Sequence, residues 1–99
     1  MNEANRGKET MKKTHVDSEE RTTRADAARF LRELADRLEG GRVVLKQGGR
    51  DVTAEVPEQV SLEVSLDETS KAAKGTKWSL EVELDWYEGG ERSGGVELG

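Results

Sequence analysis

The sequence predicts an α+β fold, with one amphipathic helix packed on one face of a four- to five-stranded, mainly antiparallel sheet. Three features predict it. Residues 24–39 carry apolar side chains at the spacing of a helix with one buried face. Two β-prone runs, residues 42–47 and 50–56, flank a Gly-Gly turn. Two longer runs, residues 60–67 and 78–86, alternate between apolar and polar side chains, as strands with one dry and one wet face do.

Length and composition set the domain organisation. The chain has 99 residues, of which 37% are charged and 32% are hydrophobic. That apolar share is low for a globular protein, but the apolar residues are concentrated in periodic runs, so the middle of the chain is predicted to fold. We expect a disordered leader over residues 1–10, a single domain over residues 11–88 and a flexible, Gly-rich acidic tail over residues 89–99.

The helix has signals at both ends. Thr23 and Asp26 have the spacing of a capping box, with Asp in place of the usual Glu or Gln. The side chains that share one stripe of the helix are Ala27, Ala28, Leu31, Leu34, Ala35 and Leu38. Gly40 and Gly41 then provide a left-handed cap, which ends the helix.

Shorter strands are predicted on either side of the helix. Gly48 and Gly49 predict a tight hairpin turn between residues 42–47 and 50–56. Pro57 cannot donate to a sheet ladder, so it marks a corner before the next strand. Residues 12–20 include Thr14 and Val16, from which we expect a short edge strand.

The second hairpin has the clearest strand pattern. Folding it about Ala72 pairs each apolar residue of one strand with an apolar residue of the other, and it sets Glu63 directly opposite Glu81, an unfavourable contact of like charges. Trp78 and Trp86 are eight residues apart, so both belong to the dry face, where we expect them to pack in the core beneath the helix. Trp86, at the strand's end, is also the better candidate of the two for contacting a ligand.

Two blocks of sequence resemble a known family. They are Ala27-Ala28-Arg29-Phe30-Leu31-Arg32-Glu33-Leu34-Ala35-Asp36-Arg37-Leu38-Glu39-Gly40 and Lys77-Trp78-Ser79-Leu80-Glu81-Val82-Glu83-Leu84-Asp85-Trp86. From about residue 11 to residue 88 the chain resembles the amphi-Trp domain. The shared motifs are patterns of burial, so the resemblance implies a fold and leaves the function open.

Catalytic and cofactor signatures are missing from the sequence. Without cysteine there is no disulfide, thiolate metal site or thiol nucleophile. His15 is the only histidine, and it lies in a polar stretch with no partner set for catalysis or zinc binding. The residues Gly48-Gly49-Arg50 lack the length and the Lys-Ser/Thr of a P-loop, and no dinucleotide fingerprint is present. We therefore predict that the protein is not an enzyme and has no cofactor.

Charge suggests what the protein avoids and what it binds. The net charge is −5, so we expect no binding to nucleic acid or to anionic membranes. No apolar run has the length of a signal peptide's core or a membrane span, which makes a cytoplasmic location the expectation. The lysines Lys71, Lys74 and Lys77 between the last two strands are predicted to be a solvated turn.

The wet face of the second hairpin is the candidate functional surface. Its carboxylates match a basic protein partner, and we predict a non-enzymatic interaction module that docks a protein or forms a homodimer, through this face or a free edge strand. The alternative is a protein that binds a cation such as Ca²⁺ or Mg²⁺, or a small ligand, with the same oxygens. The candidate partner-binding residues are Glu63, Glu81, Glu83, Asp85 and Trp86.

Overall fold

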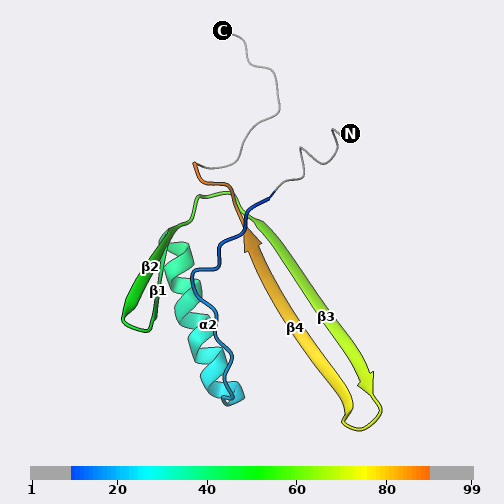
Figure 1. The fold of residues 1–99 in the computed structure, drawn as a ribbon. Helices are drawn as coiled ribbons and strands as arrows, with labels where there is room; N and C mark the ends of the chain where they lie inside the picture. The colour runs from blue at the N-terminus through cyan, green and yellow to red at the C-terminus, as the bar shows by residue number, and fades with distance from the viewer. Residues whose placement is uncertain (1–9, 90–99) are drawn as a thin grey trace, which may run out of the picture.

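The fold is α+β, as predicted. The computed structural model describes residues 10–89, and Figure 1 shows one helix beside two separate hairpins. The predicted leader and tail lie almost wholly outside the described residues. In chain order the elements are α2 (Arg24–Glu39), β1 (Arg42–Gln47), β2 (Arg50–Glu55), β3 (Ser61–Lys71) and β4 (Gly75–Asp85).

The prediction of one four- to five-stranded sheet is wrong for the described chain. Strand β1 pairs only with β2, and β3 only with β4, so residues 10–89 form two antiparallel sheets of two strands each. Residues 56–60, which include Pro57, connect the two hairpins without joining a ladder. The β3–β4 hairpin extends from this connection as a separate arm (Figure 1).

Helix α2 begins and ends where the sequence predicts. The Asp26 backbone N–H donates to Thr23 Oγ1 at 3.0 Å, which is the first half of the capping box. The Asp26 carboxylate does not complete the box and instead forms an ion pair with Arg29 at 2.8 Å. At the other end Gly41 has a φ of 85°, so it is the left-handed residue that stops the helix.

The helix packs on β1, not on the β3–β4 hairpin. Val43 in β1 is the buried apolar residue of this contact, at 9% exposure, and Leu34 and Leu38 of the helix are half-buried. Phe30 and Leu31 remain more than half exposed. The turn that joins β1 to β2 has positive φ at Gly48 (60°) and Gly49 (78°), the conformation that favours glycine at both central positions of a tight hairpin.

Residues 12–20 do not form the predicted edge strand. This segment is bound to the β1–β2 hairpin by side-chain hydrogen bonds and not by a backbone ladder. Gln47 Nε2 donates to the Asp17 carbonyl at 2.9 Å, and an Arg50 guanidinium N–H donates to the His15 carbonyl at 2.6 Å. Val16 is half-buried and His15 is exposed. The segment therefore lies against the β1–β2 hairpin without adding a strand to its sheet.

The β3–β4 hairpin is longer than predicted, and its register differs by two residues. Gly75 has a φ of 89°, and the Lys74 N–H donates to the Lys71 carbonyl at 3.2 Å, so the turn is centred on Ala73 and not on Ala72. Leu66 therefore pairs with Leu80 and not, as the sequence pattern predicts, with Trp78. A shift of two residues changes the partners but keeps every side chain on its predicted face.

Candidate functional site: the two faces of the β3–β4 hairpin

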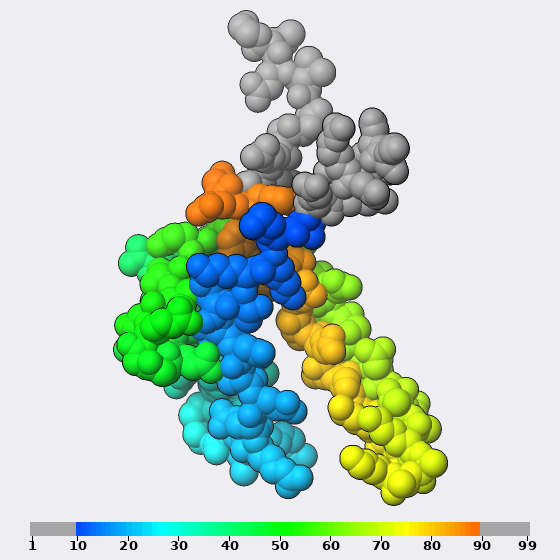
Figure 2. Space-filling model, in the orientation of Figure 1, coloured from blue at the N-terminus to red at the C-terminus, as the bar shows by residue number. Residues whose placement is uncertain are grey.

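One face of the β3–β4 hairpin is mostly apolar and exposed, and Glu68, across from Trp78, is the charged residue on it. We call its six large, exposed side chains the apolar ladder: Leu62, Val64, Leu66, Trp78, Leu80 and Val82. Their exposed fractions run from 58% for Val64 to 70% for Leu80. The prediction that helix α2 buries this face, with both indoles in the core, is wrong: Trp78 is 60% exposed and Trp86 is half-buried. Figure 2 shows open space between this arm and the rest of the molecule.

The opposite face carries the predicted carboxylates. Glu63 lies directly across from Glu83, so the like-charge pair predicted between Glu63 and Glu81 exists with a different partner. Glu81 and Asp85 flank Glu83 on the same face of β4. We call these four residues the acidic face. Neither of the two ion pairs in residues 10–89 involves them, since those pairs join Arg29 to Asp26 and Arg42 to Glu55.

Mutual repulsion on the acidic face has an electrostatic consequence. Asp85, by its charge and by a side-chain hydrogen bond, raises the pKa of Glu83 above its ordinary value of 4.5, and Glu63 and Glu81 add to the effect. The group is fully exposed, so burial plays little part. The acidic face thus holds concentrated negative charge, which favours binding of a cationic group.

We expect Glu83 to titrate above 4.5, and Asp85→Asn to lower its midpoint, because Asp85 is the largest cause of the shift. A pKa raised on folding means that the hairpin is more stable with Glu83 protonated. That stabilisation is fully present below pH 4.5, the ordinary pKa of the group, and is lost as the pH rises through the pKa of Glu83 in the folded chain. Carbon-detected NMR titration of the side-chain carboxyl measures the midpoint. An unchanged midpoint in Asp85→Asn would contradict the assigned cause.

Trp86 is not part of the acidic face. It follows the last residue of β4 and lies near Gln59 and Val60, at the base of the hairpin. The structure therefore brings four of the five predicted site residues together on one face, and the fifth, Trp86, lies next to Asp85 but outside the paired strands.

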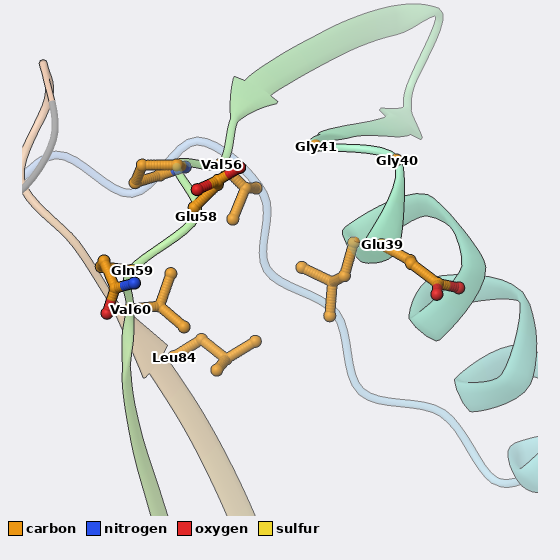
Figure 3. Close-up of a pocket in the computed structure, with 10 residues that line it drawn as sticks. Glu39, Gly40, Gly41, Val56, Glu58, Gln59, Val60 and Leu84 are labelled. Atoms are coloured by element: carbon orange, nitrogen blue, oxygen red, sulfur yellow. The ribbon is translucent and has the colours of Figure 1, made fainter.

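The base of the hairpin is open toward the end of the helix. A hollow of about 710 Å³ lies between the α2 C-terminus and the start of the β3–β4 hairpin. Figure 3 shows Val60 and Leu84 pointing across it toward the helix, with Gly40 and Gly41 on the far side. The exposure of the apolar ladder could not be predicted from the sequence, because alternation shows which residues share a face but not what covers that face.

The structure gives no arrangement for a metal. Within residues 10–89, no group of three or more His, Cys, Asp or Glu side chains is placed to hold an ion. Helix α2, the helix in this part of the chain, is not long and apolar enough to cross a membrane.

The chain also matches a known protein family. The family model of the amphi-Trp domain matches residues 10–99. The chain belongs to the amphi-Trp domain family. No curated protein and no solved structure matches it. In this amphi-Trp domain, Trp78 lies in β4 on the face opposite the acidic face, and Trp86 follows the last residue of that strand.

Proposed function

We propose that this amphi-Trp domain is a non-enzymatic interaction module that docks a basic protein surface on its acidic face. The observation that carries the proposal is the position of Glu63 across from Glu83, flanked by Glu81 and Asp85, in a cluster strong enough to raise the pKa of Glu83. A partner carrying Lys or Arg would relieve this repulsion, so binding is favoured by more than the new contacts alone.

The shape of the arm supports docking of a protein. Strands β3 and β4 each contain 11 residues and, within residues 10–89, are paired only with each other, so in this part of the chain both outer edges and the acidic face are accessible. Clustered charge also speeds encounter with an oppositely charged surface, and salt weakens this effect. A complex formed in this way is expected to loosen as the ionic strength rises.

Reversing two charges tests the proposal. We expect Glu81→Lys/Glu83→Lys in the full chain to lose the partner that the unmodified chain captures from extracts of the native host, with at least about a tenfold loss of affinity, because like charges then face each other across the interface. Circular dichroism checks that the variant folds.

A matched control separates this site from net charge. Glu19→Lys/Glu20→Lys makes the same change in charge at two exposed residues outside every helix and strand, and we expect it to keep the partner. Capture of the same protein by the Glu81/Glu83 variant, or its loss from the control as well, would refute docking on the acidic face.

A further inference from the structure

The apolar ladder lies on the side of the hairpin that the proposed function does not use. We infer that it is covered by the apolar ladder of a second copy of this chain, in a two-fold symmetric homodimer. Six large apolar side chains, each at least 58% exposed, form a continuous strip along both strands. A hairpin of two strands is marginally stable in water by itself and needs further packing on its apolar face.

The rest of the described chain does not supply that packing. Helix α2 contacts β1, and Val43 is the only buried apolar side chain in residues 10–89. Chains of this size that lack a sufficient core are commonly stabilised by oligomerisation. We therefore expect a second copy of the chain to supply the apolar packing that this hairpin lacks.

The area of the strip fits a stable dimer. At about 100 Å² of apolar surface for each aliphatic side chain and about 200 Å² for Trp, the exposed fractions leave about 400 Å² of apolar surface on each copy. Two copies would bury about 800 Å² of apolar surface. Since about 65% of a homodimer's interface is apolar, the whole interface would reach about 1,200 Å², the lower end of specific protein interfaces.

A charge on the ladder's own face selects the orientation. Glu68 lies across from Trp78, toward the tip of the hairpin, on the same face as the apolar ladder. If the two hairpins run in opposite directions, the two Glu68 carboxylates lie at opposite ends of the dimer, whereas hairpins that run in the same direction bring these like charges to the same end. The Trp78 side chain of one copy then lies over Leu84 of the other, and both acidic faces point outward.

A dimer formed by pairing two strand edges would not account for the exposed apolar ladder. It would extend the sheet but leave both apolar ladders in water. Packing of face on face buries the ladders and keeps the edges and the acidic faces free, so this dimer is independent of docking on the acidic face.

The first test is the mass of the full chain in solution, measured by light scattering after gel filtration. We expect twice the chain mass of 10.9 kDa. Leu80→Asp should give the monomer mass, and Glu81→Lys/Glu83→Lys should stay dimeric. A monomeric unmodified chain, a dimeric Leu80→Asp or a monomeric Glu81/Glu83 variant would overturn the inference. Loss of partner capture with the dimer intact would concern only the acidic face.

A second test does not depend on a disruptive variant. The chain has no cysteine, so single cysteines can be introduced without background. With a short bismaleimide crosslinker, we expect Val82→Cys to form a covalent dimer in high yield. Glu83→Cys is the neighbouring residue on the opposite face, and we expect little crosslinking from it. Equal yields from the two variants, or a higher yield from Glu83→Cys, would overturn packing through the apolar ladder.

Discussion

Replacing Val43 by Asp is expected to unfold the unit formed by α2, β1 and β2. Val43 is the buried apolar residue between helix and strand, at 9% exposure, and Phe30 and Leu34 line the groove beside it. A carboxylate there would replace the buried apolar contact between helix and strand, and removing a charge from water costs several kcal/mol even with the exposed Arg37 and Lys46 side chains on the same groove. That cost exceeds the net stability of about 3–5 kcal/mol expected for so small a core.

Far-UV circular dichroism measures this effect as loss of the helix signal. Leu45→Asp is the matched control, since Leu45 lies on the same face of β1 but is 37% exposed, and we expect it to retain the helix. Val43→Ala should remain folded with a loss of about 2 kcal/mol, for two methyl groups and a small cavity. A folded Val43→Asp would contradict the placement of the core.

Replacing Gly41 by Val is expected to lower the free energy of unfolding by about 2 kcal/mol, because a β-branched residue is strained at positive φ. Gly41 has a φ of 85° and cannot easily change it: its N–H donates to the Leu38 carbonyl at 3.0 Å, and its carbonyl accepts from the Val56 N–H at 2.9 Å. A Cβ at this position would lie 3.6 Å from the Val56 oxygen, an ordinary contact, so the cost comes from the backbone conformation.

Thermal unfolding of the full chain measures the loss, and about 10 °C of midpoint corresponds to 2 kcal/mol in a domain of this size. Gly40→Ala is the control in the adjacent residue. Gly40 has a helical φ of −79°, and a Cβ there would lie 3.5 Å from the Arg37 carbonyl, so we expect no loss of stability. Equal effects of the two substitutions would show that Gly41 does not set the helix end.

The elements with local signals could be predicted from the sequence. Thr23 caps the start of α2 and Gly41 ends the helix, and each depends only on residues close to it in the chain. The turn at Gly48 and Gly49 sets the β1–β2 hairpin in the same way. The register of β3 and β4 was predicted two residues away from its true value, because the left-handed residue that closes this turn is Gly75 and the alternating pattern repeats every two residues.

The candidate site could be predicted in part. Glu63, Glu81, Glu83 and Asp85 share one face, as their spacing requires, whereas Trp86 follows the last residue of β4 and is not paired in the ladder. The segment holding His15 and Asp17 was predicted as a strand but is held by Gln47 and Arg50 side chains, a contact between residues 30 or more apart in the chain that local pattern does not encode.

The sequence by itself determined which side chains share a face, because backbone geometry alternates them along a strand and repeats them every 3.6 residues along a helix. Only the tertiary structure decided what covers each face. The helix stripe packs on β1, next to it in the chain, and the apolar ladder of β3 and β4 is left without cover in residues 10–89. Which face is covered depends on how residues 56–60 orient the second hairpin and on contacts between segments far apart in the chain. A periodic pattern of apolar residues does not give the free energies of such contacts.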